Sequence, residues 1–395
     1  AGAQAVRVGL LGEAVVQQTL LALGVAVLGR EAEHEGYVLC ADGEGALVAG
    51  HDAAGIFYGL QLLRQLLQRR EGRLTIAPVE VHDWPATPLR GVHVYMPPRA
   101  EMSFYRRFLE YLSGLRYNTV FLEVGGGMRY DRHPEINQGW EAFVRSISRH
   151  SADVMRAEHG YAWPKNSTHY ELAGGSYLEK DEVSQLIAWA RELHIQTLPE
   201  VQSLSHSYYL CCPHPEIAEH AEDPYPDTYC PSNPASYALL FDVLEEVIEV
   251  FRPPLIHTGH DELYLLGLCP RCRGKSGADL LAGDINRIHG FLAERNIRMA
   301  MWGDKLMDIV IGGQAEGGHQ RIIAPGSWFQ NQEPFVIPET YRAIERVPRD
   351  ILILNWYWGV DPQAQAYFAA QGFQQILGNL AQQGRWGLRG WEQQT

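Results

Sequence analysis

The chain has 395 residues, of which 46% are hydrophobic and 20% charged, a composition typical of globular proteins with a large core. Its formal net charge of −14 argues against nucleic acid or an anionic membrane surface as a partner. No apolar run is long enough to span a bilayer, and no basic segment followed by an apolar core marks the N-terminus. We therefore expect a cytoplasmic location of the bacterial type.

The first part of the chain, residues 1–85, has the pattern of a small α/β domain. Short apolar runs predict strands at residues 6–11, 37–40 and 46–49. A helix is predicted over residues 53–69, because Ile56, Leu60, Leu63 and Leu67 recur at three- and four-residue steps on one face. The proline-punctuated segment 83–88 then predicts a domain boundary near residue 85.

Strand-like and helix-like segments alternate through residues 86–395. Helical periodicity appears in residues 104–115, 181–194 and 237–251. Strands are predicted at residues 91–96, 119–124, 196–201, 255–258, 298–302, 321–325, 351–355 and 373–377. Eight strands of this kind indicate a (β/α)8 TIM-type barrel with a shortened C-terminal end, and so an α/β fold class. An open doubly wound sheet is the alternative, although no glycine-rich nucleotide fingerprint follows a strand.

Two adjacent carboxylates, Asp261 and Glu262, follow the apolar run 255–258. In a parallel barrel, catalytic groups gather where strands end. Neighbouring acids repel each other, so one of them can stay ionised while burial holds the other protonated. The alternative interpretation is a solvated Asp-Glu pair that caps the next helix.

Other polar and aromatic residues follow the remaining strands. The candidates are Arg99, Glu123, Glu200, His206, His257, Trp302, Asp304, Trp328, Asn355, Trp356, Tyr357 and Trp358. Aromatic walls with carboxylates and an arginine are typical of a pocket for a sugar. His206, His257, Asp261 and Glu262 would also suit a catalytic divalent metal, which keeps that class of enzyme as an alternative.

The six cysteines are too sparse for a disulfide scaffold in a chain of this length. Cys269 and Cys272 form a Cys-x-x-Cys pair, and Cys211, Cys212 and Cys230 lie in another proline-rich loop. The two loops predict a structural zinc site of Cys269, Cys272, Cys230 and one of Cys211 or Cys212, with Cys212 taken as the fourth ligand. Free thiols or a disulfide are the alternatives.

Several motifs together resemble glycoside hydrolase family 20, the β-N-acetylhexosaminidases. The segment 257–262, His-Thr-Gly-His-Asp-Glu, is similar to the family's His-x-Gly-Gly-Asp-Glu. Residues 90–91 followed by Arg99, residues 199–201 followed by His206, and residues 301–304 are similar to its motifs on strands one, three and five. Residues 55–61 resemble a helix of the α/β domain that precedes the family's barrel.

The resemblance implies a retaining, substrate-assisted exo-β-N-acetylhexosaminidase that acts on glycans ending in N-acetylglucosamine or N-acetylgalactosamine, with no cofactor. Glu262 would be the general acid and base, Asp261 would stabilise the oxazolinium ion, and Tyr357 would bind the acetamido carbonyl. The substrate-binding residues would be Arg99, Glu123, His206, Trp302, Asp304, Trp328, Trp356 and Trp358.

The chain also departs from the family pattern. His260 stands where the family has glycine, and the bulkier ring is expected to narrow or recharge the site. The family's aspartate after strand two is missing, which leaves the preference at the sugar's 4-position open. The short C-terminal end leaves the pocket either open on that side or completed by a second subunit in a homodimer. A metal-dependent barrel hydrolase and a non-catalytic N-acetylhexosamine-binding barrel remain the alternative functions.

Overall fold

The computed structural model of the protein describes residues 5–27, 29–42, 45–147, 152–311, 313–326, 330–356 and 363–378. The chain divides into two compact units. The smaller unit consists of residues 1–91 with 108–119 and 190–195, and the larger unit consists of residues 92–107, 120–189 and 196–395. The domain boundary near residue 85 stays a prediction.

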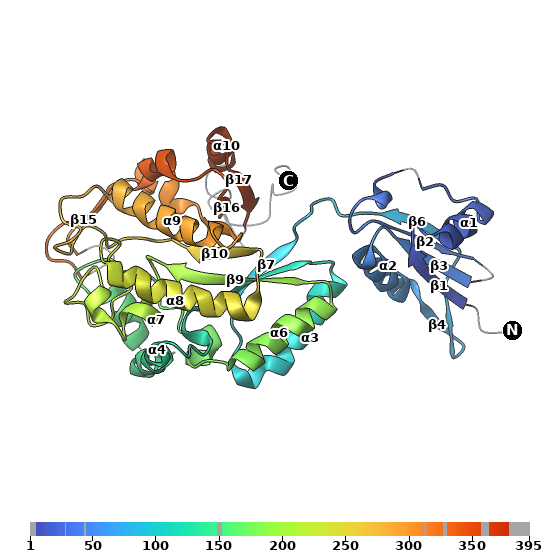
Figure 1. The fold of residues 1–395 in the computed structure, drawn as a ribbon, viewed down its shortest axis with the longest axis horizontal. Coiled ribbons are helices and arrows are strands. Elements are labelled where there is room, and N and C mark those ends of the chain that lie inside the picture. The colour runs from blue at the N-terminus through green and yellow to red at the C-terminus, as the bar shows by residue number, and fades with distance from the viewer. Residues whose placement is uncertain are drawn as a thin grey trace. The chain divides into compact units, whose positions relative to one another are not determined.

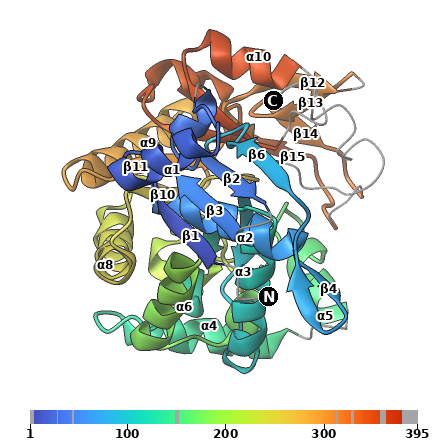
Figure 2. The same cartoon turned by 90° about the vertical axis from the view of Figure 1, so that its right-hand side faces the viewer.

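The smaller unit is built on a four-stranded sheet in the order β1-β3-β2-β6, whose strands lie side by side in Figure 2. Its strands are β1 (Ala5–Leu10), β2 (Tyr37–Ala41), β3 (Gly45–Gly50) and β6 (Val79–Asp83). The pair β1–β3 is parallel, whereas β2 runs antiparallel to β3 and to β6. A small hairpin of β4 (Gln68–Arg70) and β5 (Arg73–Thr75) lies outside this sheet.

Helices α1 (Ala14–Ala22) and α2 (Ala53–Leu66) cover opposite faces of this sheet, because side chains alternate along a strand. On β2, Val38 and Cys40 pack in one cluster with Val16 and Leu20 of α1. The alternate residues Tyr37 and Leu39 pack in a second cluster with Tyr58 and Leu63 of α2. The smaller unit therefore has three layers, and its predicted strands and predicted helix are confirmed.

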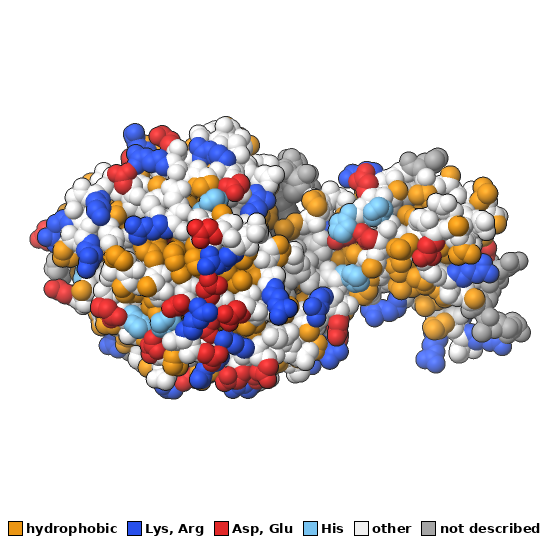
Figure 3. Space-filling model, in the orientation of Figure 1, with side chains coloured by type: hydrophobic (Ala, Val, Ile, Leu, Met, Phe, Trp, Pro, Cys, Tyr) orange, Lys and Arg blue, Asp and Glu red, His pale blue; other side chains and the backbone are white. Residues whose placement is uncertain are grey.

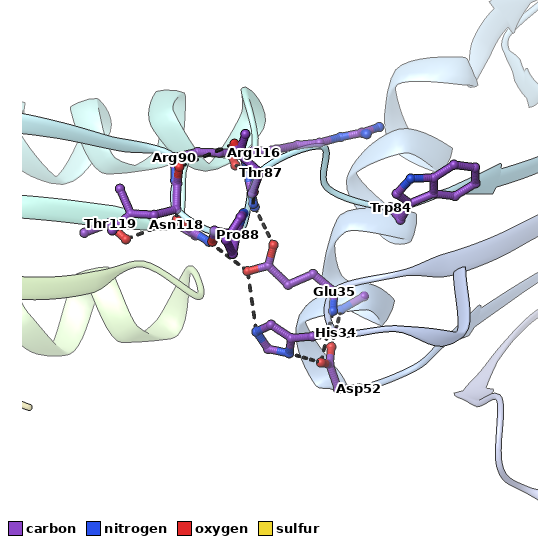
Figure 4. Close-up of polar contacts among 12 residues, drawn as sticks. His34, Glu35, Asp52, Trp84, Thr87, Pro88, Arg90, Arg116, Asn118 and Thr119 are labelled. Carbon is purple, nitrogen blue, oxygen red and sulfur yellow. Dashed lines mark hydrogen bonds and ion pairs between the residues drawn. The ribbon is translucent and has the colours of Figure 1, made fainter. Parts of the chain in front are cut away.

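A buried carboxylate, Glu35, holds together loops of the smaller unit (Figure 4). It accepts hydrogen bonds from Arg90 at 2.5 Å and from the side-chain amide of Asn118 at 3.0 Å. Asn118 also donates to the carbonyl of Pro88 at 2.8 Å. Charge-assisted bonds of this kind are stronger than neutral ones, so the network fixes the segment that leads into the first barrel strand.

The larger unit contains a seven-stranded sheet in the order β17-β16-β11-β10-β9-β8-β7 (Figure 1). The strands are β7 (Gly91–Tyr95), β8 (Thr119–Glu123), β9 (Gln196–Ser203), β10 (Leu255–Gly259), β11 (Arg298–Trp302), β16 (Leu352–Asn355) and β17 (Gln374–Leu377). The four pairs from β9 to β17 are parallel. The strands follow one another across the sheet in the order in which they occur along the chain, which is the topology of a TIM-type barrel.

One predicted barrel strand, residues 321–325, is wrong. Its residues Arg321–Ile323 form β14, which pairs antiparallel with β15 (Phe335–Ile337) in a two-stranded hairpin outside the barrel sheet. A second hairpin, β12 (Asp308–Ile311) with β13 (Gln314–Gly317), precedes it. A short apolar run predicts a strand but cannot show which partner strand it pairs with. The other seven predicted strands lie in the barrel sheet.

Side chains from successive strands meet in one cluster inside the curved sheet. The strands β8, β9, β10 and β16 contribute one residue each and β11 contributes two, and the cluster contains Phe121, Leu198, Leu255, Ala300, Trp302 and Leu354. Ile376 of β17 packs against the same cluster. Inward-facing side chains fill the interior of such a barrel, so the chemistry is left to the strand ends.

Helices follow most of the barrel strands. They are α3 (Met102–Gly114), α4 (Pro134–Ser146), α5 (Ala152–His159), α6 (Lys180–Glu192), α7 (Tyr208–Cys211), α8 (Pro234–Phe251), α9 (Gly277–Ala293) and α10 (Gln363–Ala370). Within the part of the chain that the structure describes, none of the helices is both long and apolar enough to cross a membrane. Acidic and basic side chains are intermingled over the larger unit's face in Figure 3. Arg132 forms ion pairs with Asp242 and Glu249.

Candidate functional site

The Asp261-Glu262 pair sits directly after β10, where the backbone turns sharply. Gly259, His260 and Glu262 have positive φ values of 69°, 74° and 49°. The left-handed conformation is unfavourable for residues with a side chain, and such residues gather at functional sites. The turn ends the buried strand and places the two carboxylates at its carboxyl end, as the sequence predicts.

The two carboxylate oxygens of Asp261 differ in their partners. Its side chain is 16% exposed, and Oδ2 lies 3.4 Å from Nε2 of His206. Oδ1 is buried and has no hydrogen-bond partner among the described residues. Burial alone would raise the pKa of Asp261, but the charge of His206 holds it below its ordinary value. A buried carboxylate oxygen in this state is suited to accept a hydrogen bond from a ligand N–H or O–H group.

His206 is the cation that balances this acidic site. Its ring is buried, with Nδ1 3.1 Å from the carbonyl oxygen of Ser167 and Nε2 3.6 Å from Oε2 of Glu262. Burial would lower its pKa, but the charges of Asp261, Glu262 and Glu123 raise it to about 10. His206 is therefore an imidazolium at neutral pH, and both ring nitrogens carry protons.

Glu262 is the more accessible of the two acids, with 36% of its side chain exposed. Its backbone N–H donates to Oδ2 of Asp304 at 3.0 Å. The buried side-chain amide of Asn166, oriented by its partners, donates to the carbonyl oxygen of Glu262 at 2.5 Å and accepts from the backbone N–H of His206 at 3.1 Å. The backbone of Glu262 is thus held on both sides while its carboxyl group faces outward.

A buried carboxylate, Glu200 on β9, organises the interior beneath these residues. Its oxygens meet the ring of His93, Nδ1 of His257 at 3.0 Å and Nε1 of Trp302 at 2.9 Å. Burial alone would raise the pKa of Glu200, but His93 and His257 hold it well below its ordinary value. Glu200 in turn raises the pKa of His93 to about 9, against the effect of burial. This cluster fixes the indole of Trp302.

A second chain of polar contacts leads from β8 to the site. Oε1 of Glu123 lies 2.9 Å from Nδ1 of His169, whose ring stacks on that of His206 with centroids 4.3 Å apart. Oε2 of Glu123 is buried without a hydrogen-bond partner in the described part of the chain. Glu123 therefore keeps one oxygen available for a hydroxyl group of a ligand.

Asp304 follows β11 and is buried next to Lys305, whose Nζ lies 3.8 Å from Oδ2. Burial raises the pKa of Asp304 to about 7, and the charge of Asp261 adds to that rise. Because Asp304 accepts a hydrogen bond from the backbone N–H of Glu262, it stabilises the turn after β10.

The structure brings together most of the predicted residues that it describes. Asp261, Glu262, His206, Glu123 and Asp304 are connected by the contacts above, whereas Trp302 belongs to the cluster around Glu200. Trp356 packs against the barrel cluster. Trp328, Tyr357 and Trp358 lie outside the described residues.

The predicted role of Arg99 is not supported. Its side chain is 55% exposed, and its guanidinium group forms a two-point ion pair with Glu182 of α6, with nitrogen–oxygen distances of 2.6 and 2.7 Å. Arg99 begins a short 3-10 turn, Arg99–Glu101, which directs the side chain toward α6. The pairing satisfies its charge at the surface.

The expectation that His260 narrows or recharges the site is wrong. Its Nε2 lies 2.9 Å from Oδ2 of Asp284 on α9, and its Nδ1 lies 3.2 Å from Oγ1 of Thr258. Asp284 also accepts hydrogen bonds from the hydroxyl groups of Tyr229 and Tyr237. The ring is fully buried in this network, so it anchors the turn to α9.

The predicted cysteine site is only partly assembled as expected. Cys230, Cys269 and Cys272 converge, but the fourth member of the group is Glu219. The thiol of Cys212 points instead to the carbonyl oxygen of Pro226, 3.9 Å away. The spacing of cysteines in the sequence could not reveal a carboxylate that a separate turn supplies.

Metal-ligand geometry among the described residues does not favour the set His206, Asp261 and Glu262. The other group whose donor atoms lie within 4.8 Å of one another is His93, Glu123 and Glu200. In that group, Glu200 already pairs with His93, and Glu123 pairs with His169. The charges of both carboxylates are therefore balanced by imidazole rings, without a metal ion.

Sequence reasoning missed His93, His169 and Asn166. His93 points inward from the first barrel strand, a position where the alternation of the strand gives a signal. His169 and Asn166 lie in the long connection between α5 and α6, where no periodicity shows which side chains reach the site.

Comparisons with known proteins agree with this architecture. The family model described as "Glycosyl hydrolase family 20, catalytic domain" matches residues 135–377, and "Glycosyl hydrolase family 20, domain 2" matches residues 5–84. The β-hexosaminidase of Porphyromonas gingivalis is 24% identical over 62% of this chain and 30% of its own length. That of Vibrio vulnificus is 22% identical over 85% of this chain and 44% of its own length.

The chain therefore spans less than half the length of these two curated relatives. The crystal structure of β-N-acetylhexosaminidase from Bacteroides fragilis superimposes with a TM-score of 0.66 and 18% identity. The match covers 95% of this chain and 71% of the Bacteroides fragilis chain. The similarity confirms the predicted fold of a TIM-type barrel preceded by a small α/β domain.

Proposed function

Because the chain belongs to glycosyl hydrolase family 20, we propose that it is a retaining exo-β-N-acetylhexosaminidase, which removes terminal β-linked N-acetylglucosamine or N-acetylgalactosamine from glycans. The relatives from Porphyromonas gingivalis and Vibrio vulnificus, both β-hexosaminidases, support this activity. The reaction needs no cofactor, because the substrate's own acetamido group supplies the nucleophile.

The observation that carries the proposal is the state of Asp261. One of its oxygens faces the His206 imidazolium, and the other is buried without a partner in the described structure. In a substrate-assisted reaction, an acetamido N–H would donate to the unengaged oxygen and so turn the acetamido oxygen toward the anomeric carbon. As positive charge develops on the oxazolinium ring, the carboxylate stabilises it.

Glu262 supplies the proton transfers. In the first step its carboxylic acid donates a proton to the glycosidic oxygen while the bond from that oxygen to the anomeric carbon breaks and the acetamido oxygen bonds to the same carbon. In the second step the Glu262 carboxylate takes a proton from water, whose oxygen attacks the anomeric carbon and reopens the ring. Two inversions retain the configuration. The exposure of Glu262 suits exchange with water.

Binding of the sugar hydroxyls falls to other groups in this chain. The buried Oε2 of Glu123 has no protein partner among the described residues and is suited to accept from a hydroxyl. We assign to Trp302 a wall of the acetamido pocket, since its indole is held by Glu200. The predicted roles of Tyr357, Trp328 and Trp358 stay part of the proposal.

The test is hydrolysis of nitrophenyl β-N-acetylglucosaminide and β-N-acetylgalactosaminide. We expect turnover by the native sequence, inhibition by a thiazoline analogue of the cyclised intermediate, and no effect of brief EDTA treatment. Glu262→Gln should lower kcat about 10²–10⁴-fold. Glu249→Gln, a matched change at an exposed residue of α8 that pairs with Arg132, should leave kcat unchanged.

The outcomes separate the alternatives. Rapid loss of turnover with EDTA and recovery with a divalent metal would favour a metal-dependent barrel hydrolase. Binding of N-acetylhexosamines by the folded protein without turnover would favour a non-catalytic sugar-binding barrel. The predicted homodimer and cytoplasmic location stay predictions, to be checked by sedimentation velocity and by cell fractionation.

A further inference from the structure

Three cysteine thiols and one carboxylate from two loops of the larger unit meet at one point. Glu219 and Cys230 lie in the connection between α7 and α8, whereas Cys269 and Cys272 lie between β10 and α9. One donor atom from each of the four lies within 4.8 Å of the others. Sγ of Cys230 is 3.3 Å from that of Cys269 and 3.5 Å from that of Cys272.

These sulfur separations fit a shared metal ion better than a disulfide. A disulfide needs an S–S distance of about 2.05 Å, and all three cysteines are free thiols here. A tetrahedral zinc ion with Zn–S bonds of about 2.3 Å sets its sulfur ligands about 3.8 Å apart. The Cys-x-x-Cys loop is a tight turn, in which the N–H groups of Cys272 and Arg273 donate to the carbonyl oxygen of Cys269 at 3.0 and 2.9 Å.

Glu219 completes the group with an oxygen that has no other use in the described structure. Its Oε1 accepts from the backbone N–H groups of Leu268 at 2.7 Å and Cys269 at 3.2 Å, which fixes the carboxylate against the loop. Its Oε2 is buried without a hydrogen-bond partner among the described residues. The carboxylate of Glu219 is buried in the protein. A cation beside Oε2 would offset the cost of burying this charge.

We propose that Cys230, Cys269, Cys272 and Glu219 bind a structural Zn²⁺ ion. Thiolates are soft ligands that select zinc over calcium or magnesium. All four positions around the ion would be filled by protein, which is typical of structural rather than catalytic sites. Oγ of Ser232 accepts hydrogen bonds from Nζ of Lys275 at 2.8 Å and from the thiol of Cys272 at 3.3 Å, so a positive charge lies near the cysteines.

The zinc would join the two loops that carry the catalytic residues. His206 lies between β9 and the Glu219–Cys230 loop, and Glu262 lies between β10 and the Cys269–Cys272 loop. A bond between the loops keeps the His206 ring facing Asp261 and Glu262. The site thus positions the catalytic groups without contacting the substrate.

Metal analysis of the native protein, purified without chelators, tests the proposal directly. We expect about one zinc ion per chain by inductively coupled plasma mass spectrometry. The ion should be released by a mercurial thiol reagent and detected with a chromophoric chelator. Replacement by Co²⁺ should give the visible absorption of a tetrahedral thiolate site. Zinc-equilibrated native protein that holds no zinc, or a disulfide within the group found by mass spectrometry, would overturn the proposal.

Variants then identify the ligands. Cys269→Ser should lose the zinc, and Glu219→Gln should weaken zinc affinity at least about tenfold because the amide keeps the hydrogen bonds to the loop but lacks the charge. Cys212→Ser is the matched control, since its thiol lies outside the group, and it should keep full zinc content. Equal zinc affinity in Glu219→Gln and the native protein, measured by competition with a chromophoric chelator, would remove Glu219 from the ligand set.

Stability gives a readout that does not depend on hydrolysis. Removal of zinc from the native protein should lower Tm by at least about 5 °C, and zinc should restore it. If the protein holds zinc and its Tm depends on zinc, but it has no hydrolase activity, the zinc site is established and the proposed function is refuted instead. An unchanged Tm after complete removal would refute the structural role.

Discussion

The backbone N–H of Glu262 donates to Oδ2 of Asp304 at 3.0 Å, so the outermost acid of the site is held by a buried carboxyl group that follows the next barrel strand. Glu262 has a φ of 49°, a conformation that costs free energy for a residue with a side chain. The hydrogen bond offsets that cost. Catalysis by Glu262 should therefore depend on the carboxyl group of Asp304.

Replacement of Asp304 should show this dependence. Asp304→Asn keeps an acceptor oxygen, whereas Asp304→Ala leaves the N–H of Glu262 unpaired. We expect Asp304→Ala to lower the free energy of unfolding by about 1–3 kcal/mol more than Asp304→Asn. It should also lower kcat more than it raises KM. Urea unfolding and steady-state kinetics measure both, and equal losses in the two variants would contradict this account.

His206 should make stability depend on alkaline pH. Its pKa is raised to about 10, above the value of about 6.5 in an unfolded chain, because it faces Asp261 and Glu262. The folded state therefore binds the extra proton more tightly, and this contribution is full below about pH 6.5 and is lost as pH rises toward 10.

The free energy of unfolding should be measured for the native protein and for His206→Gln across this pH range. The native protein should lose on the order of 3 kcal/mol of unfolding free energy relative to the variant between pH 6.5 and 10. Parallel curves for the two proteins would show that His206 does not titrate in this way.

His260→Gly should destabilise the protein even though it relieves an unfavourable φ of 74°. The change removes the ring that pairs with the buried Asp284. We expect a loss of about 3–5 kcal/mol, since one partner of a buried pair is left alone. The double variant His260→Gly, Asp284→Asn should recover part of that loss in chemical denaturation. No recovery would indicate that the two side chains are not coupled.

Glu200→Gln should change the charge of the barrel interior. With the carboxylate gone, nothing equivalent balances His93, whose pKa is raised to about 9 mainly by Glu200 against the effect of burial. The pKa of His93 should fall clearly below about 9, because its main charge partner is gone. Nuclear magnetic resonance titration of the ring protons measures this, and a pKa that stays near 9 would contradict it.

Arg99→Ala should have little effect on activity. The side chain is 55% exposed and paired with Glu182 of α6. Exposed ion pairs contribute less than about 1 kcal/mol to stability. KM for the nitrophenyl sugars should stay within about twofold of the native value, which corresponds to about 0.4 kcal/mol. A large rise in KM would restore the role that the sequence predicts.

The sequence predicts the site best where strand pattern and chemistry coincide. Asp261 and Glu262 follow a continuous apolar run, so their place at a strand end is readable from local pattern alone. Glu123 and Asp304 are found in the same way. For His260 the sequence shows the residue but not its partner, because Asp284 lies on the following helix and the pairing depends on tertiary packing.

Other differences between the sequence predictions and the structure have the same origin. The direction of Arg99 depends on a single turn of 3-10 helix, and the hairpin that contains β14 depends on a partner strand fourteen residues further along. Glu219 lies in a loop with no periodicity, so only the folded chain brings it to the cysteines. Local pattern predicts elements, whereas contacts between loops require the fold.

Positions 259 and 260 in the turn after β10 both have positive φ values, but they differ in the space available for a side chain. At Gly259, an added Cβ would lie 1.8 Å from Oε1 of Gln202, whose amide donates to Glu200 at 3.1 Å. At position 260 a full imidazole ring is accommodated. If both positions were randomised and selected for activity, we expect glycine alone to survive at 259, while several polar residues that reach Asp284 would survive at 260. Both positions have a left-handed backbone, but the residues packed against them differ. These neighbouring residues therefore decide which side chains each position can accept.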